Sequence, residues 1–222
     1  LFFYNTLVNK MKYIGGKQRI GKKIAEAIVR YLKTHTSNTY TSYIEPFCGA
    51  LGVYKHIYMM LLGKVDLFFA YDKQEDIIKL WQELFSDKFD PPKKLSKNEW
   101  QALKLSKVPS SMKAFAGFAC SFNGIYFSSY ANHNSRDIPG EGRRALLKTK
   151  KMLTKNVINF ERKDYKTITP KNSIIYCDPP YKYNKKGSMT TLFTSFDHKL
   201  FWETMREWSV NNIVFISELK GN

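Results

Sequence analysis

Short apolar runs alternate with helical spacing over the first 85 residues of the chain and again from residue 156 onward. Apolar runs bounded by turn residues are typical of buried strands, and apolar residues that recur every three or four positions are typical of helices. The pattern predicts buried strands over 39–45, 65–71, 156–160, 173–177 and 212–217. It predicts helices over 22–32, 53–62 and 73–85, and a further helix that begins at Ser195, Phe196 and Asp197. Strands that alternate with helices in this way indicate an α/β fold.

Two of these helices carry apolar residues that share one face. In the first helix these residues are Ile24, Ile28 and Tyr31. In the last helix they are Phe201, Met205 and Trp208. Because residues three or four positions apart lie on the same side of a helix, we expect both sets to pack against the sheet.

The alternation lapses between residues 86 and 155. Prolines at positions 91 and 92 interrupt it. Helical stretches are predicted over 98–105 and 112–121, and a polar, turn-rich run follows over 123–142. A chain of 222 residues can hold one sizeable core with a smaller inserted part. We therefore predict one α/β domain built from residues 11–85 and 156–222, with residues 86–155 inserted as a mostly helical lobe.

Positive charge is concentrated in and around this lobe. The chain has a formal net charge of +17 and a pI near 9.7. Residues 91–162 contain 14 Lys or Arg against 4 Asp or Glu, so they carry +10 of the +17. Such a field attracts polyanions, which indicates a nucleic-acid partner, and the alternative is a basic surface that is only solvated. Side chains suited to phosphates and base edges lie among these charges, and they are Tyr126, Tyr130, Asn132, Asn134, Arg136, Arg143 and Arg144.

Several classes of protein are disfavoured by the composition. The three cysteines, Cys48, Cys120 and Cys177, are widely spaced, which argues against a disulfide framework or a structural zinc site and favours a reducing, intracellular setting. The four histidines are scattered too widely to suggest a metal site. No run approaches the roughly 20 apolar residues that cross a bilayer, so we expect no membrane partner. Met11 is a candidate start of the functional chain.

The stretch 173–181 carries the clearest chemical signal. A buried strand is halted by Pro179 and Pro180, so the preceding Asp178 is presented at the carboxyl end of that strand, where α/β sheets bind ligands. A carboxylate and a proline carbonyl can both accept hydrogen bonds from an amino group that is conjugated with a ring. The ring of Tyr181 can stack on the base that carries this amino group. The alternative is a strand end closed by an ordinary turn.

Two glycine-containing turns precede it in the chain. Gly15 and Gly16 allow the backbone to lie against a ligand, and Lys17 then offers a charge to a carboxylate or phosphate, unless the turn is simply exposed. The turn over 46–52 joins a strand to a helix, as in nucleotide-binding folds. Asp72 ends the following strand about 20 residues later, where an acidic residue accepts from ribose hydroxyls. An adenosine-bearing cofactor is therefore indicated, although Asp72 can also be explained as a helix cap.

Two further segments have two interpretations each. Asp164 follows a predicted strand, where its carboxylate can accept from the amino group of a bound adenine or can belong to a surface turn. The segment 182–191 is rich in Lys, Gly and Ser, so it either covers a bound substrate or is a plain connection.

Several of these motifs, in this order, resemble the Dam-like DNA adenine-N6 methyltransferases of the D12 class. The resemblance runs from about residue 12 to residue 220. It implies a Rossmann-like methyltransferase sheet with helices on both faces, so that residues 11–85 and 156–222 form a cofactor-binding catalytic domain and residues 86–155 a target-recognition insertion. The motifs that carry it are Tyr13-Ile14-Gly15-Gly16-Lys17, Glu45-Pro46-Phe47-Cys48-Gly49, Asp72, Phe122-Asn123-Gly124, Asp164-Tyr165, Asp178-Pro179-Pro180-Tyr181 and Val214-Phe215-Ile216-Ser217.

The resemblance also implies a role for each matching residue. S-adenosylmethionine is the expected cofactor, and its contacts are expected to be Tyr13, Lys17, Phe47, Gly49, Asp72, Asp164, Tyr165 and Asp178. Catalysis is assigned to Asp178, Pro179, Pro180 and Tyr181, which would hold a flipped adenine for direct methyl transfer to its N6 amino group. Contacts to duplex DNA are assigned to Asn123, Tyr126, Tyr130, Asn132 and Arg136.

Other readings of the function stay open at the level of the sequence. An RNA base methyltransferase would use the same Asp-Pro-Pro-Tyr chemistry on another substrate. A relative with weak catalysis would bind nucleic acid through the lobe without transferring a methyl group. For the favoured interpretation we expect a solitary enzyme or one from a restriction-modification or viral system. We expect it in the cytoplasm, with the nucleus as the alternative. A homodimer is left open.

Overall fold

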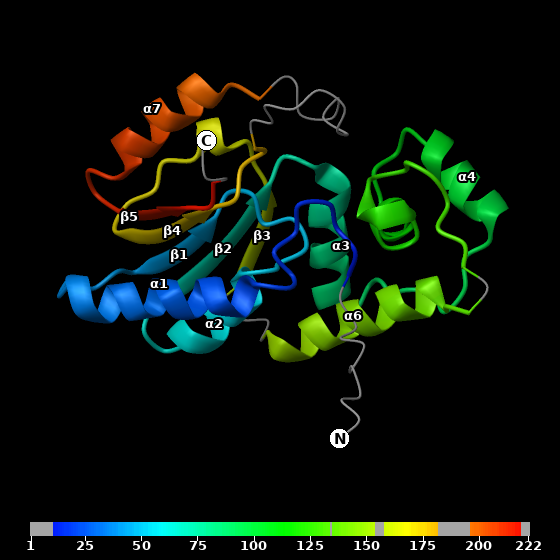
Figure 1. Ribbon diagram of the computed structural model, residues 1–222, viewed down its shortest axis with the longest axis horizontal. Coiled ribbons are helices and arrows are strands. Elements are labelled where there is room, and N and C mark those ends of the chain that lie inside the picture. Colours follow the sequence, from blue (N-terminus) through cyan, green and yellow to red (C-terminus); the bar gives the residue numbers. More distant parts are fainter. Residues whose placement is uncertain (1–10, 134, 154–157, 182–195, 219–222) are drawn as a thin grey trace.

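The computed structural model describes residues 11–133, 135–153, 158–181 and 196–218. Within these residues a sheet of five parallel strands runs through the centre of the molecule, in the order β3-β2-β1-β4-β5. Figure 1 shows helices on both sides of this sheet. The predicted α/β class with a Rossmann-like arrangement is confirmed. The strands are β1 (Ser42–Glu45), β2 (Leu67–Asp72), β3 (Ile158–Arg162), β4 (Ser173–Cys177) and β5 (Ile213–Ile216).

Successive side chains of the central strands pack alternately into two separate hydrophobic cores. Tyr43 of β1 and Tyr176 of β4 pack with residues of α1 (Gly21–His35), α2 (Tyr54–Leu61) and α3 (Glu75–Phe85). Ile44 and Cys177, one position later, belong to the core under α7 (His198–Trp208). This alternation follows from the strand geometry, which sends successive side chains to opposite faces.

The apolar faces of the two outer helices both lie toward the sheet. Phe201, Met205 and Trp208 of α7 are all buried, and each such side chain stabilises the fold by about 1.5–3 kcal/mol. In α1, Ile28 is buried, whereas Tyr31 is 44% exposed, stacks on His35 and contacts the Phe215 ring of β5 edge-on at 5.6 Å.

The strand β5 differs from the fully buried strand that its apolar sequence predicts. Each of its four residues is only half-buried. Among the described residues β5 pairs with β4 alone, so it forms an edge of the sheet. An apolar run does not by itself distinguish an edge strand from a central one.

The inserted lobe is mostly helical, as predicted, but its helices differ in detail. The expected helix over 112–121 is split, since α5 (Ser111–Ala114) passes into a π-helical turn (Phe115–Ala119). A 3-10 turn (Phe122–Gly124) follows it. The other expected helix is present as α4 (Lys97–Leu105), which begins with a capping box between Ser96 and Glu99.

A long helix, α6 (Ile138–Met152), begins inside the run 123–142 that was predicted to be turn-rich. Asp137 caps it by accepting a hydrogen bond from the Gly140 amide at 3.0 Å. Pro139 stands in the first turn, where its missing N–H costs nothing. The expectation of turns up to residue 142 is therefore wrong, and the turn residues at 137–140 are the start signal of a helix.

Helix α3 joins the sheet to the lobe (Figure 1). On one side Trp81 and Phe85 stack near Phe160 of β3, and on the other side α3 packs against α5. The buried core continues from the sheet into the lobe as one cluster that includes Trp100 and Phe115. In the described part of the chain, no helix combines the length and the apolar character that crossing a membrane requires.

Candidate active site

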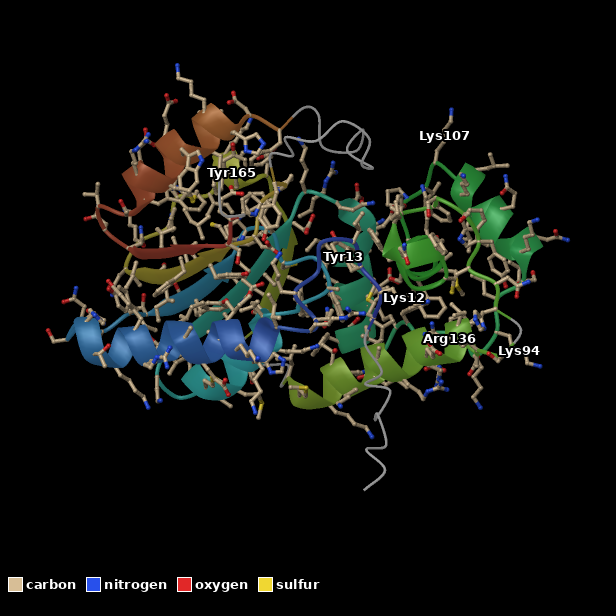
Figure 2. The ribbon with its side chains drawn as sticks, in the orientation of Figure 1. Lys12, Tyr13, Lys94, Lys107, Arg136 and Tyr165 are labelled. Atoms are coloured by element: carbon tan, nitrogen blue, oxygen red, sulfur yellow. The ribbon has the colours of Figure 1, made fainter. Side chains whose placement is uncertain are left out.

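A cavity of about 570 Å³ opens at the carboxyl ends of β1, β2 and β4. These ends meet because the strands are parallel and in register, with Ile44 beside both Phe69 and Ile175. The turn over 13–17 and the segment that follows β3 complete its walls. Figure 2 marks Tyr13 and Tyr165, which both line the cavity.

Every residue to which the sequence assigned a catalytic or cofactor-binding role lies on the wall of this one cavity. The structure thus brings together segments that are distant in the chain, from the N-terminal turn to the end of β4. Proximity alone does not test the individual roles, which remain proposals. The residues are Tyr13, Lys17, Phe47, Gly49, Asp72, Asp164, Tyr165, Asp178, Pro179, Pro180 and Tyr181.

Asp178 is held at the end of β4 by two partners. The Lys17 ammonium lies 2.5 Å from its Oδ1 atom and 2.7 Å from its Oδ2 atom. The Tyr181 hydroxyl donates to Oδ1 at 2.8 Å, and the Lys17 ammonium lies 4.7 Å from the centre of the Tyr181 ring. Burial raises the pKa of Asp178, and the adjacent Lys17 opposes that rise. The result is a carboxylate with raised proton affinity inside a partly enclosed pocket.

Asp72 stands at the end of β2 and accepts two backbone hydrogen bonds. The Gly49 amide donates to its Oδ2 atom at 3.0 Å and the Gln74 amide to its Oδ1 atom at 2.9 Å. Burial raises the pKa of Asp72 to about 6, although these amides favour its charged form. Both oxygens have a second lone pair, so the carboxylate retains capacity to accept from a ligand.

Gly49 forms a tight turn under the ring of Tyr13. Its φ angle of +42° is unfavourable for other residues, and a Cβ atom there would lie 2.8 Å from the Tyr13 ring. Its carbonyl accepts a hydrogen bond from the Trp81 indole at 2.8 Å, which fixes the turn to α3. The glycine thus lets the turn between β1 and α2 lie flat against an aromatic wall of the cavity.

Asp164 and Tyr165 line the opposite side of the cavity. Asp164 pairs with Lys73 at 3.2 Å and caps a short 3-10 turn (Tyr165–Thr167). The ring of Tyr165 lies 5.4 Å from that of Phe47. The Tyr165 hydroxyl is buried and has no hydrogen-bond partner among the described residues. A buried hydroxyl without a partner is unfavourable.

Sequence reasoning missed several residues of the cavity wall. Glu45 ends β1, is 3% exposed and accepts a hydrogen bond from the Tyr43 hydroxyl at 2.5 Å. Burial raises its pKa well above the ordinary value. Its position at a strand end was a usable signal, because Asp72 and Asp178 occupy equivalent places. Gln74, Phe118 and Tyr176 also line the cavity, and nothing in their local sequence marks them.

Of the five residues assigned to DNA contacts, only Tyr126 lines the cavity. Tyr130 is half-buried and donates its hydroxyl to the Leu95 carbonyl at 2.6 Å within the lobe. Arg136 forms a two-point ion pair with Glu141 on the lobe surface. Asn123 and Asn132 are exposed, and Asn123 has a φ angle of +54°. The assignment of these five residues to DNA contacts stays a prediction.

Much of the lobe's positive charge is paired with carboxylates. Arg143 contacts Asp90, Arg144 contacts Asp137, and Lys150 contacts Asp87. Lysines on and beside α4 are exposed to solvent, and Figure 2 shows Lys94 and Lys107 among them. The described residues hold no cluster of three or more His, Cys, Asp or Glu side chains that suits a metal ion. All three cysteines are buried, free thiols.

Comparison with known proteins gives one family. Residues 121–219 match the family model of the D12 class N6 adenine-specific DNA methyltransferases. The matched region contains the end of β4, Asp164 and part of the lobe. A search of curated proteins gave no match. Over residues 121–219 the match agrees with the predicted family, and it supports a DNA methyltransferase enzyme.

Proposed function

We propose that this D12 class DNA methyltransferase moves the methyl group of S-adenosylmethionine to the N6 amino group of an adenine that has rotated out of duplex DNA into the cavity. One observation carries the proposal. Asp178, Pro179, Pro180 and Tyr181 line the same cavity as Gly49 and Asp72, so the residues suited to an amino group and those suited to an adenosine share one space.

The residues present fit the cofactor. A cavity of about 570 Å³ falls in the range of about 300–1,000 Å³ that is usual for small-molecule sites. Asp72 is the proposed partner of the ribose hydroxyls, Asp164 of the adenine amino group and Lys17 of the carboxylate. The ring of Tyr165, packed beside Phe47, is a further apolar part of the wall. When bound, the cofactor supplies a methyl group on a positively charged sulfur.

Asp178 has the central role in the proposed chemistry. The N6 lone pair of adenine is delocalised into the ring, which makes the amino group a poor nucleophile. Hydrogen bonds from its two hydrogens to the Asp178 carboxylate and the Pro179 carbonyl would localise that lone pair on nitrogen. The nitrogen then forms a bond to the methyl carbon as the carbon–sulfur bond breaks, and it gives up one proton. The pKa of Asp178 is raised by burial, which suits it to accept this proton.

Tyr181 and Lys17 complete the proposed arrangement. The Tyr181 ring offers a surface on which the flipped base stacks, while its hydroxyl orients Asp178 at 2.8 Å. Lys17 occupies both oxygens of Asp178, so it must turn away before an amino group can bind there. The carboxylate of the cofactor provides Lys17 with an alternative partner of the same charge.

The lobe is proposed to hold the DNA. Exposed lysines on and beside α4 contact phosphates, which supplies affinity that depends on salt but not on sequence. This affinity offsets the few kcal/mol that unstacking the target base costs. The lysines are Lys93, Lys94, Lys97, Lys104 and Lys107.

Labelled methyl transfer tests the proposal. The protein is incubated with methyl-labelled cofactor and either duplex DNA or RNA, and the nucleosides are separated after digestion. N6-methyladenine in duplex DNA is the expected product. Label in RNA alone would make the protein an RNA base methyltransferase, and label in neither would leave a nucleic-acid-binding relative without this activity.

A further inference from the structure

A buried carboxylate in the first turn of α3 holds two separate segments of the lobe. Asp76 is 5% exposed. Its Oδ1 atom accepts a hydrogen bond from the Ser110 amide at 2.8 Å, where α5 begins. Its Oδ2 atom accepts a hydrogen bond from the Tyr126 hydroxyl. One side chain of the sheet domain therefore fixes both the start of α5 and the segment that follows the 3-10 turn.

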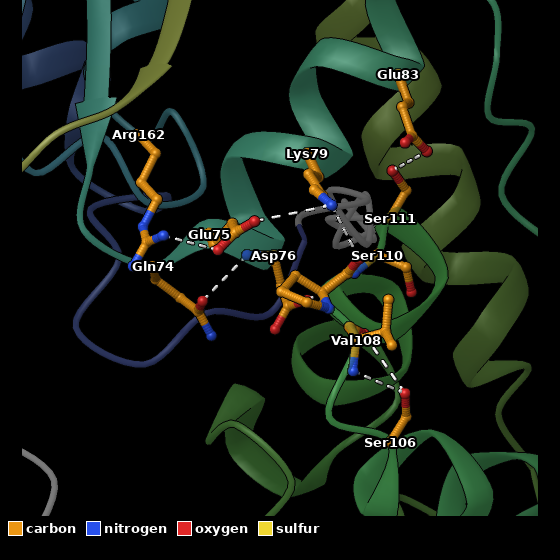
Figure 3. A network of polar contacts seen from close by, with 11 residues as sticks. Gln74, Glu75, Asp76, Lys79, Glu83, Ser106, Val108, Ser110, Ser111 and Arg162 are labelled. Carbon is orange, nitrogen blue, oxygen red and sulfur yellow. Dashed lines mark hydrogen bonds and ion pairs between the residues drawn. The ribbon is translucent and has the colours of Figure 1, made fainter.

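Asp76 is also connected to the floor of the cavity. The Gln74 side chain accepts a hydrogen bond from the Asp76 amide at 3.1 Å, and the Gln74 amide donates to Asp72 at 2.9 Å. Asp72 in turn accepts from the Gly49 amide. Figure 3 shows Gln74 beside Asp76 at the start of α3. A continuous series of hydrogen bonds thus runs from the turn at Gly49 to the lobe.

The lobe reaches the cavity wall through Tyr126 and Phe118, which are its lining residues among those described. Their rings lie 4.7 Å apart. The Tyr126 ring rests on Gly117, where any Cβ atom would collide with it. The hydroxyl at the far end of the ring donates to Asp76.

Other contacts between α3 and the lobe lie away from the cavity (Figure 3). The Lys79 ammonium donates to the Pro109 carbonyl at 3.2 Å, and the Ser111 hydroxyl donates to Glu83. These bonds attach the lobe to α3 but touch no residue of the cavity wall. The hydrogen bond between Asp76 and Tyr126 differs, because it connects α3 to a residue of the lobe that lines the cavity.

We propose that Asp76 is a positioning residue that, through Tyr126, sets the lobe against the cavity and so couples cofactor binding at Asp72 to DNA binding at the lobe. The inference rests on the proposed function, since it takes Asp72 as a cofactor contact and the lobe as the DNA contact. Each ligand orders one end of the same hydrogen-bonded series, so the presence of one improves the affinity for the other.

Binding measurements with Tyr126→Phe test this coupling. The Kd for a DNA duplex is measured with and without saturating S-adenosylhomocysteine, and the ratio of the two values is the coupling. We expect a ratio of about 5 to 150 for the natural protein, which is the usual range, and a ratio near 1 for Tyr126→Phe. The variant keeps the ring against Gly117. Any change in DNA affinity that is the same with and without S-adenosylhomocysteine cancels in the ratio, so the ratio reports the coupling alone.

Two control variants separate coupling from general loosening. Tyr54→Phe makes the same chemical change at a hydroxyl that has no partner among the described residues. Ser111→Ala removes a bond of the same junction that lies away from the cavity. Both should keep the natural ratio. Asp76→Asn cannot accept hydrogen bonds from both the Ser110 amide and the Tyr126 hydroxyl, so it should lower the ratio as Tyr126→Phe does. It provides a second test if Tyr126→Phe folds poorly.

The proposal is overturned if Tyr126→Phe and Asp76→Asn keep the natural ratio, if Ser111→Ala lowers it equally, or if the natural protein shows no coupling. The measurement requires no methyl transfer. A protein that binds DNA with coupling but methylates no adenine would therefore contradict the proposed function and leave this inference intact.

Discussion

The Lys17 ammonium and the Asp178 carboxylate form an ion pair across 161 positions of the chain, with both oxygens within 2.7 Å of the nitrogen. This pair joins the N-terminal turn to the end of β4 at the centre of the cavity. In this pair Lys17 occupies the Asp178 oxygens, which in the proposed chemistry accept hydrogen bonds from the amino group of adenine. In the proposed chemistry, cofactor binding and base binding therefore depend on the same lysine.

Lys17→Met should move the pH dependence of methyl transfer to higher pH. Lys17 opposes the effect of burial on Asp178, so its removal raises the pKa of that carboxyl further. The ionised carboxylate then forms only at higher pH. The measurement is kcat/KM between pH 6 and 9, which reports the pKa of the free enzyme, before Lys17 turns away from Asp178. Lys22→Met, on the exposed side of α1, is the control, and an unshifted profile in Lys17→Met would show that this pair does not govern the reaction.

Asp178→Asn should lower kcat by about 10²–10³-fold, the usual effect of losing one strong electrostatic contact in a transition state. The amide keeps the volume but presents one acceptor and no charge. Affinity for duplex DNA should change little, because the lysines of the lobe supply it. Single-turnover transfer and DNA binding are measured on the same preparation. Near-natural transfer by the variant would remove Asp178 from the mechanism.

Asp72 should make both stability and cofactor binding depend on pH. Because burial raises its pKa from 3.8 to about 6, the folded state holds the proton more tightly than the unfolded state does. The stabilisation from this group is present below pH 3.8 and is lost as the pH rises through about 6. Cofactor affinity should change in the opposite sense, since the ionised carboxylate is the better acceptor.

Asp72→Asn tests both effects of that carboxyl. The difference in melting temperature between the variant and the natural protein should vary between pH 4 and 7, and the cofactor affinity of the variant should lose its rise near pH 6. Calorimetry at several pH values measures both. Parallel curves for the two proteins would mean that another group titrates.

Gly49→Ala should weaken cofactor binding as well as folding. The new Cβ atom would lie 2.8 Å from the Tyr13 ring, at a φ angle of +42°. Gly63→Ala is a matched control, because Gly63 has a φ angle of +77° with nothing within 4 Å of the added atom. Backbone strain should lower the free energy of unfolding of the control, measured in urea, by about 1–2 kcal/mol. Gly49→Ala should lower it by more and should also bind the cofactor less tightly. Equal losses in the two variants would contradict a role for the Tyr13 contact.

The sequence was most informative where a single local signal decides the structure. Asp72 and Asp178 each follow an apolar run at a point where the strand must stop, so their places at strand ends were predictable. Parallel pairing then brings these ends together without further information. The strands and the cavity that they form follow from these few rules.

Side chains that turn inward from distant segments could not be predicted. Lys17 was expected to face the cofactor, and nothing in its neighbourhood indicates that it also holds Asp178. Tyr126 and Tyr130 lie four positions apart in the run that was predicted to be turn-rich, yet the first lines the cavity and the second donates its hydroxyl to the Leu95 carbonyl. The start of α6 was missed for another reason, since Asp137 and Pro139 suit a turn as well as a helix cap.

The pairing of β3 with β2 has a consequence for how the molecule folds. Phe68 lies beside Ile158, so the sheet gains its last strand on this side only when the chain returns from the whole inserted lobe. Closing so long a loop carries an entropic cost that short-range helices do not have. Because α3 contacts both α5 and β3, the lobe can collapse onto α3 first and bring the two strands close. The sheet is then completed only after the lobe has formed. Until that late step, the free edge of β2 stays exposed in newly made chains.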